Sequence, residues 1–515
     1  MKAESRTYKS LLNSGVALFM FIINFILQFY SRKIFLDYLG TEILGLNTTA
    51  TNLLQFLNLA ELGISSAVGF TLFKPIHDAD HITINEILTL QKHLYRRIAY
   101  FVILGAVILM GFFPLIFSKI TLPLWYAYGS FGVLLFSSLL GYFINYKQVI
   151  LTASQRDYLV QISYKSVLMI KLLLQIYAVM NFNNGYAWWL IIEAVFAILS
   201  SMSLHIATIK SYNYFMKVTK SFAELKDSYP NFTVKIKQMF FHKIGGFALQ
   251  QSSPLIIYAY TSLSIVALYG NYYMIVLGII SLMASISNSI NGGVGNLVAE
   301  GNESKIINVF WELFSARFFI ITTFCFCAYK LIPAFVTLWI GSQYLLPNNT
   351  LILLIIILFI QLSRQLIDSY LTAYALTRDI WSPIVEALIN IIGSIILGKF
   401  FGLNGILIAV IMSLILMIFC WKQYFLIREG MIYSVKKYIL NYIYHFITGS
   451  ASIFLCLTIT NKISILKDLS SNWSNFILSA LSYFLISAST LFILMYTIFP
   501  SFRQFIVRLK SFINR

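Results

Sequence analysis

The strongest constraint on this chain is a series of apolar stretches that recur from Leu11 to Phe499 with only short polar breaks between them. A helix needs about 20 mainly apolar residues to cross a bilayer, because each residue adds about 1.5 Å to its length. Hydrophobic residues make up 59% of the sequence and charged residues 11%, which is far from the balance of a soluble domain. The sequence therefore predicts an all-α, polytopic membrane protein.

We expect about fourteen transmembrane helices. They are placed approximately at residues 11–30, 43–70, 98–117, 122–150, 159–180, 186–209, 239–260, 265–298, 313–332, 350–371, 380–400, 403–427, 438–460 and 473–499. The longest break between them is predicted to be a loop, and seven basic residues lie in the segment from Lys210 to Lys243. The predicted organisation is an N-terminal six-helix lobe (1–211), a cytoplasmic linker (212–238), a C-terminal six-helix lobe (239–430), and two additional helices with a cytoplasmic tail (431–515).

The distribution of Lys and Arg predicts the orientation of the chain. With the N-terminus inside, inner segments hold 29 of the 37 basic residues and outer segments hold seven, and Lys171 lies in mid-membrane. This asymmetry follows the positive-inside rule, so both termini are expected in the cytoplasm of a bacterial cell, with the protein in its inner membrane. The net charge of +18 is then explained by topology and contacts with lipid headgroups, and no nucleic-acid partner is expected.

Polar side chains share one face on several predicted helices. In the second helix their spacing is four or three residues, which places them on one stripe. The stripes are Asn24, Gln28 and Arg32; Asn47, Thr51, Gln55, Asn58 and Glu61; His242, Gly246, Gln250 and Ser253; and Ser281, Ser285, Asn288 and Asn291. Polar groups facing lipid are costly, so the stripes line a water-filled cavity or form hydrogen bonds between helices.

Ionisable residues at membrane depth are candidate functional groups. Lys171 and Glu193 lie at similar distances from the predicted outer turn 181–185, so an antiparallel hairpin allows them to form an ion pair. The pair is either a static brace, or Lys171 meets an anionic substrate and Glu193 carries a coupling proton. Arg32, Arg364 and Glu386 are candidates for lining a lumen, although the two arginines are also placed to reach headgroups.

The sequence contains no arrangement typical of an enzyme. Three histidines and two aspartates lie between residues 77 and 93, but loops of this kind are usually solvated, and we expect no metal there. A phosphate-binding loop of the P-loop kind is absent, so ATP is not expected as the direct energy source, and no cofactor is expected.

Several motifs resemble one family of transporters. The N-terminal motif runs from Arg32 to Pro75, and the C-terminal motifs are LWIGSQYLL (Leu338 to Leu346), Arg364, SPIVEALIN (Ser382 to Asn390) and FGLNGI (Phe401 to Ile406). The marks within the first motif are Arg32, Leu39, Gly40, Gly45, Leu46, Glu61, Leu62 and Gly63. In order and spacing these motifs are similar to those of the polysaccharide transporters, the O-antigen and capsule flippases of the multidrug/oligosaccharidyl-lipid/polysaccharide (MOP) exporter superfamily. The resemblance extends to about Ile427.

The resemblance implies two six-helix lobes around a central cavity, alternating access, and a substrate in which a polyprenyl pyrophosphate carries an oligosaccharide. Such a substrate requires cations for the pyrophosphate and amides for the glycan. The expected substrate-binding residues are Arg32, Lys171, Asn24, Gln28, Asn47, Gln55, Asn58, Gln250, Asn288 and Arg364, with Glu61, Glu193 and Glu386 as ion-coupling candidates. Arg32 and Lys171 are expected to contact the pyrophosphate, and a polysaccharide polymerase and a chain-length regulator are implied partners.

Three alternatives remain beside a surface-polysaccharide flippase. Lipid II flippases share the implied architecture, but their usual opening motif is not matched by the stretch from Ser31 to Gly45. A multidrug exporter is expected to carry acidic residues in its lobe cavities, and the first predicted helix has none. A membrane polymerase or acyltransferase needs an acid or base near the outer surface, whereas the outer loops 181–185 and 341–349 hold no ionisable candidate.

Overall fold

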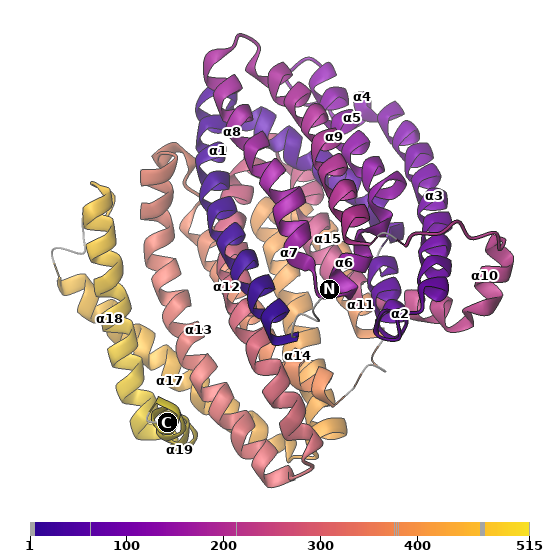
Figure 1. Ribbon diagram of the computed structural model, residues 1–515. Coiled ribbons are helices and arrows are strands. Elements are labelled where there is room, and N and C mark those ends of the chain that lie inside the picture. Colours follow the sequence, from indigo (N-terminus) through magenta and orange to yellow (C-terminus); the bar gives the residue numbers. More distant parts are fainter. Residues whose placement is uncertain are drawn as a thin grey trace. The chain divides into compact units, whose positions relative to one another are not determined.

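The computed structural model of the protein describes the backbone of residues 6–61, 63–212, 214–374, 376, 379, 381–463 and 469–513. Side chains are described for the same residues except 6–11, 14, 60, 231, 233, 241–246, 248–250, 285–292, 512 and 513. Within this described part the chain is helical and contains no strand (Figure 1). The prediction of an all-α protein is confirmed.

The chain divides into two compact units, Met1–Ala267 and Leu268–Arg515. The lobe boundaries predicted from the sequence are not tested by this division and stay a prediction. The elements of the first unit are α1 (Arg6–Leu57), η1 (Asn58–Glu61), α2 (Ile64–His77), α3 (His81–Gly111), α4 (Phe113–Ile116), α5 (Trp125–Phe143), η2 (Asn145–Gln148), α6 (Val149–Ala153), α7 (Asp157–Val160), η3 (Gln161–Lys165), α8 (Ser166–Asn181), α9 (Gly185–Ser211), α10 (Phe222–Ser228), α11 (Pro230–Tyr260) and the start of α12 (Leu263–Ala299).

The second unit begins within α12 and continues to the C-terminus. Its further elements are α13 (Glu303–Trp339), η4 (Ser342–Tyr344), α14 (Asn348–Ala373), α15 (Trp381–Leu414), η5 (Ile415–Lys422), α16 (Gln423–Phe425), η6 (Leu426–Met431), α17 (Val435–Lys462), α18 (Trp473–Ile498) and α19 (Pro500–Ile513). Helix α13 packs against α14, α17, α18 and α19, so it is central to this unit (Figure 1).

Eleven helical stretches in the described part of the chain are long and apolar enough to cross a membrane. Two of them, Gly15–Leu57 and Trp381–Met431, each contain a break in helical geometry. The candidate spans support a multi-pass membrane protein, and the number of fourteen crossings stays a prediction.

Glycine permits both breaks. Gly40 has φ +82° inside α1, and Gly402 has φ +55° inside α15. These backbone angles are costly for a residue with a Cβ, so the chain turns at the glycines and helix resumes at once. The predicted boundary after residue 30 is wrong for this reason, because α1 remains helical through Arg32 and Lys33 as far as the kink at Gly40.

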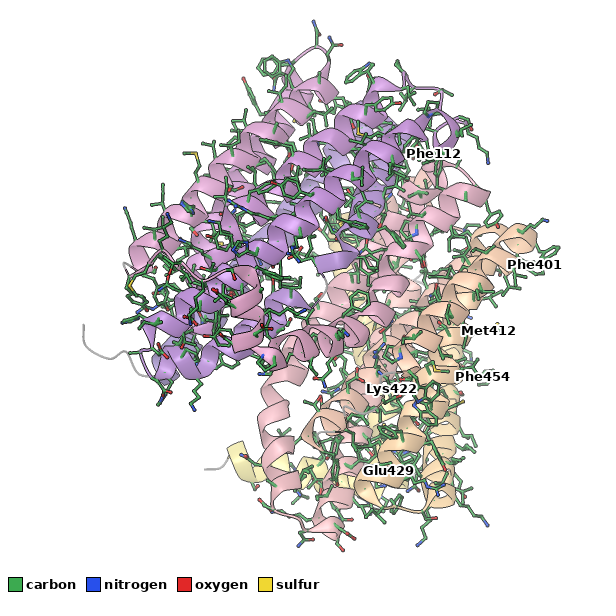
Figure 2. All side chains as sticks on the ribbon, turned by 90° about the vertical axis from the view of Figure 1, so that its right-hand side faces the viewer. Phe112, Phe401, Met412, Lys422, Glu429 and Phe454 are labelled. Atoms are coloured by element: carbon green, nitrogen blue, oxygen red, sulfur yellow. The ribbon has the colours of Figure 1, made fainter. Side chains whose placement is uncertain are left out.

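Large apolar side chains cover the outside of both units. In the second unit Phe401, Met412 and Phe454 project outward and are 63%, 48% and 68% exposed, and in the first unit Phe112 is 53% exposed (Figure 2). In water such a surface would drive aggregation. In a bilayer the same side chains contact acyl chains, which agrees with the crossing-length helices.

The predicted loop at residues 212–238 is wrong in its second half, where α10 and the start of α11 are helical. Helix α10 begins at a capping box, in which Ser221 and Glu224 each bond the other's backbone N–H. Pro230 starts α11, since a proline at the first helical position sacrifices no helical hydrogen bond.

The linker packs closely on α3. Asn85 donates to the Tyr214 carbonyl at 3.1 Å and accepts from the Met216 N–H at 2.9 Å. Glu86 pairs with Lys220 at 2.6 Å and accepts from the Tyr229 hydroxyl at 2.8 Å. Burial and the bond to Glu86 raise the pKa of Tyr229 to about 12. The linker is therefore tied to the first unit by a buried face of α3.

Replacing Asn85 by Ala is expected to loosen this linker. Asn85 is 4% exposed, and its loss removes two part-buried hydrogen bonds to the backbone of Tyr214 and Met216, each worth about 1 kcal/mol. Limited trypsin digestion of the purified protein should then cleave faster at Lys217 and Lys220. Asn349→Ala, at an exposed position of α14, is the matched control, and equal cleavage rates in both variants would contradict the prediction.

A buried polar network joins the C-terminal helices to α13. The Ser315 hydroxyl lies 3.0 Å from Nε2 of His445 in α17 and 2.7 Å from the Ser501 hydroxyl in α19. Nδ1 of His445 donates to the Asn441 carbonyl at 2.7 Å, and the imidazole stacks on Phe499. His445 is 1% exposed, so every ring nitrogen needs a protein partner and has one.

Candidate functional site

Glu61 lies in a cluster of hydroxyl groups in the first unit. It ends the turn η1, and Gly63, with φ +94°, lies directly before α2. The Tyr95 hydroxyl donates to Oε1 of Glu61 at 3.0 Å and also lies 2.6 Å from the Ser65 hydroxyl. Among the described residues, no cation lies within ion-pair distance of Glu61. A carboxylate held only by neutral hydroxyl groups is suited to exchange a proton or bind a cation.

A cavity of about 450 Å³ adjoins this cluster. Its walls include Ser65 and Tyr95 from the cluster, together with Gln91, Tyr146 and Gln148. Gln91 is 1% exposed, and its Oε1 has no hydrogen-bond partner. The remaining wall is mostly apolar, but a cavity of this size with an unsatisfied acceptor has room for water beside the cluster.

The stripe around Asn47 and Asn58 forms hydrogen bonds within the first unit. Oδ1 of Asn47 accepts from the hydroxyl groups of Ser130 at 2.5 Å and Tyr186 at 2.7 Å. Asn58 accepts from the Tyr142 hydroxyl at 2.9 Å and donates to Ser138 at 3.1 Å. These bonds connect α1 and η1 to α5 and α9. At Asn47 and Asn58 the stripe therefore forms hydrogen bonds between helices, which is one of the two alternatives that the sequence left open.

Other members of the stripes are more accessible. Gln55 is half-buried, and Thr51 is exposed. On α1, Gln28 is exposed and lies 3.4 Å from the half-buried Asn24. These side chains remain available to a polar ligand.

Arg32 lies on α1 before the Gly40 kink and is half-buried. One of its nitrogens, Nη2, donates to the Ala267 carbonyl at 3.3 Å. Near the kink, the Thr41 hydroxyl lies 3.1 Å from that of Ser264. The start of α12 is therefore bonded to α1 on both sides of the kink.

Lys171 and Glu193 form the expected ion pair, with Nζ of Lys171 2.7 Å from Oε1 of Glu193. Gln175 donates to the other carboxylate oxygen at 2.9 Å and to the Trp189 carbonyl at 3.1 Å. The two charged side chains are 14% and 17% exposed. Both oxygens of Glu193 are thus occupied, which favours the brace between α8 and α9 over a role in proton transfer.

Arg364 is the centre of a charge cluster in the second unit. Its Nε lies 2.9 Å from Asp368, one helical turn along α14, and its Nη1 lies 3.3 Å from Glu386 on α15. Lys422 in η5 lies 3.5 Å from the other oxygen of Asp368, within the interior of the unit (Figure 2). The Glu386 side chain is 1% exposed, and its Oε2 has no hydrogen-bond partner. Arg364 and Glu386 are therefore a buried ion pair.

Three partners in these clusters, Gln175, Asp368 and Lys422, were not predicted from the sequence. Gln175 and Asp368 each lie four residues after a charged residue that was predicted, so helical spacing contained a signal for both. Lys422 reaches Asp368 from an element more than 50 residues away, which no local pattern indicates. Two further predicted residues, Gln250 and Asn288, lie outside the described side chains.

The histidines and aspartates around residue 80 have structural roles. Asp80 caps α3 by accepting from the Thr83 hydroxyl at 2.6 Å and from its N–H at 3.0 Å, and these bonds lower the pKa of Asp80. The His81 ring packs on Tyr214 of the linker. His77 lies 3.1 Å from Asp78 at the exposed end of α2.

Comparison with known proteins identifies the fold. No protein-family model and no curated protein sequence matches the chain. Among solved structures, a MATE-family multidrug resistance transporter of the MOP superfamily, in an inward-facing conformation, aligns with a TM-score of 0.55 and 14% identity. That alignment covers 79% of this chain and 94% of the transporter. The chain thus has the fold of MOP-superfamily membrane transporters.

A second solved structure aligns over almost the whole length. The lipid II flippase MurJ, in an inward closed conformation, has a TM-score of 0.66 and 16% identity, and the alignment covers 95% of this chain and 98% of that protein. The similarity therefore includes most of the C-terminal region containing α17 and α18.

Proposed function

We propose that the protein is a flippase that moves polyprenyl-pyrophosphate-linked oligosaccharides from the cytoplasmic to the outer leaflet of a bacterial inner membrane. The product serves the assembly of a surface polysaccharide such as O-antigen, capsule or exopolysaccharide. The observation that supports this most strongly is the fold likeness over 95% of the chain to a flippase of another lipid-linked glycan. The motif resemblance to polysaccharide transporters narrows the substrate class.

The chemistry of the side chains supports the same proposal. Arg32 is a half-buried guanidinium on α1 that donates to the Ala267 carbonyl, and a guanidinium has the charge and the donors that a pyrophosphate requires. Asn24, Gln28 and Gln55 are accessible amides that suit glycan hydroxyl groups. Lys171 and Arg364 pair with carboxylates, so a pyrophosphate would have to compete with Glu193 and Glu386 for them.

Lipid II flipping is the second candidate, since the solved structure with that name supports it equally on fold grounds. Complementation separates the two. The gene should restore polymer to a strain that lacks its surface-polysaccharide flippase, and it should not restore growth to a strain depleted of its lipid II flippase. Rescue of growth in the second strain alone would replace the first proposal with lipid II flipping. If the gene restored neither polymer in the first strain nor growth in the second, both flippase proposals would fail. A multidrug exporter or a polymerase would then be the better explanation.

We further propose that alternating access is driven by an ion gradient and that Glu61 is the coupling group. Proteoliposomes with labelled lipid-linked oligosaccharide provide the test. The native protein should translocate faster with a proton or sodium gradient, and Glu61→Gln should remove the response, because an amide neither titrates nor balances a cation. Equal native rates with and without a gradient would remove the coupling proposal and leave the flippase proposal intact.

Asp37→Asn is the matched control for this experiment. Asp37 is an exposed carboxylate on α1, in the same unit as Glu61. Its neutralisation changes the net charge by the same amount without altering the hydroxyl cluster. A gradient response lost in both variants would indicate a general electrostatic effect and would count against Glu61.

A further inference from the structure

A polar cavity of about 760 Å³ lies in the second unit between the start of α13 and α19. It is separate from the three charged clusters described above. Its lining comprises Asn302, Ser304, Lys305, Asn308, Val309 and Glu312 from the region of α13, and Arg503, Gln504, Val507 and Arg508 from α19. Three cationic side chains therefore surround one cavity, with several amide and hydroxyl groups.

The charges in this cavity are not fully balanced. Arg508 lies 3.0 Å from Glu312, and Lys305 lies 2.5 Å from Glu300. Arg503 is exposed and forms no ion pair within the described part of the chain. One cationic charge therefore remains for a ligand, which matches the single negative charge of a phosphodiester.

The position of α19 indicates where such a ligand would come from. Helix α18 ends at Ile498, and α19 follows from Pro500, so the cavity lies at the end of a membrane-crossing helix. Phe502 is 2% exposed and fixes α19 in the core of the unit. This is the arrangement of a short basic amphipathic helix at a membrane surface.

The rim of the cavity is apolar on one side. Val507 lines the cavity and is nevertheless 65% exposed. A free phosphate has no apolar group that could contact Val507. A phospholipid can place its acyl chains there and its headgroup among the polar side chains. The cavity thus has the two surfaces that a lipid requires.

We propose that this cavity binds the headgroup of an anionic phospholipid, with Arg503 contacting the phosphodiester and Val507 contacting the acyl chains. Asn308 and Gln504 are placed to bond the hydroxyl groups of a glycerol headgroup. Binding here would hold α19, and through it the start of α13, against the membrane surface. This proposal does not depend on the identity of the transported substrate.

Native mass spectrometry of the full-length purified protein tests the proposal. Phosphatidylglycerol and phosphatidylcholine with identical acyl chains are added separately. We expect tighter binding of phosphatidylglycerol, and Arg503→Gln should weaken it about fivefold, the value expected for one basic residue at an anionic surface. Arg503→Lys should restore most of the binding, since the charge is kept.

Lys436→Gln is the matched control, because Lys436 is an exposed basic residue at the start of α17 in the same unit. Equal weakening by Arg503→Gln and Lys436→Gln would show a diffuse charge effect and overturn the proposal. A further control uses Val507→Gln, which should weaken phosphatidylglycerol and leave glycerol phosphate unaffected. Binding of glycerol phosphate as tight as that of the lipid would show that the cavity takes a soluble phosphate, and would also overturn it.

Discussion

Replacing Lys171 by Met is expected to destabilise the first unit strongly, by about 3–5 kcal/mol, because it leaves the Glu193 carboxylate at membrane depth without its cation. Gln175 remains as a hydrogen-bond donor at 2.9 Å, but an amide does not balance a charge. Thermal unfolding of the purified variant in detergent should show a clearly lower midpoint than the native protein. The amount of protein in the membrane should fall with it.

The double variant Lys171→Met/Glu193→Gln distinguishes the brace from a substrate contact. It removes both charges, so most of the lost stability should return. If the pair is only a brace, glycan export returns as well. Normal stability without export would show instead that one of the two charges, on Lys171 or on Glu193, is needed for transport. Lys210→Met, an exposed position at the end of α9, controls for loss of one basic residue and should leave unfolding unchanged.

Arg364→Gln is expected to have an effect of similar size on the second unit. The substitution removes two ion pairs at once and leaves Glu386, whose side chain is 1% exposed, without a cation. The expected cost is again about 3–5 kcal/mol. Unfolding midpoints and export should both fall. Asp368 should be less affected than Glu386, because Lys422 remains 3.5 Å away.

Arg364→Lys provides a finer test of the geometry. A guanidinium reaches Asp368 and Glu386 with two different nitrogens, and an ammonium on a shorter stem does not span both. We therefore expect Arg364→Lys to recover only part of the lost stability. Full recovery would mean that charge alone matters and would contradict the bridging role. Arg428→Gln, which removes an exposed arginine of the same unit, is the matched control.

Much of the fold was predictable, because crossing a bilayer imposes a length and an apolar composition on each helix. The pairing of Lys171 with Glu193 was also predictable, since a tight hairpin places residues at equal distances from its turn at equal depth. The first predicted helix ended at residue 30, just before the charged Arg32 and Lys33. The observed helix continues through both residues to the kink at Gly40. The kink depends on the backbone angles of a single residue, and a hydropathy pattern contains no information about those angles.

The candidate site was less predictable than the fold. Spacing placed Glu61 on a polar stripe, but the hydroxyl groups that hold it come from Ser65 and from Tyr95 on another helix. Within the stripe, Asn47 and Asn58 form hydrogen bonds to neighbouring helices. Thr51 and Gln55 on the same stripe are more accessible. Helical periodicity identifies a shared face but not the neighbours that the face meets, because these depend on tertiary packing.

The network of Ser315, His445 and Ser501 has a consequence for biosynthesis. Ser315 and Ser501 are 186 residues apart in the chain, so at roughly 5–20 residues per second the ribosome needs on the order of 10–40 s to supply the second partner. During that interval α13 is already made, while Glu312 and Ser315 lack Arg508, His445 and Ser501. Helix α13 is therefore synthesised well before the partners of its polar side chains. A chain that stops before α17 would keep these polar groups unsatisfied, and membrane quality control would recognise it by them.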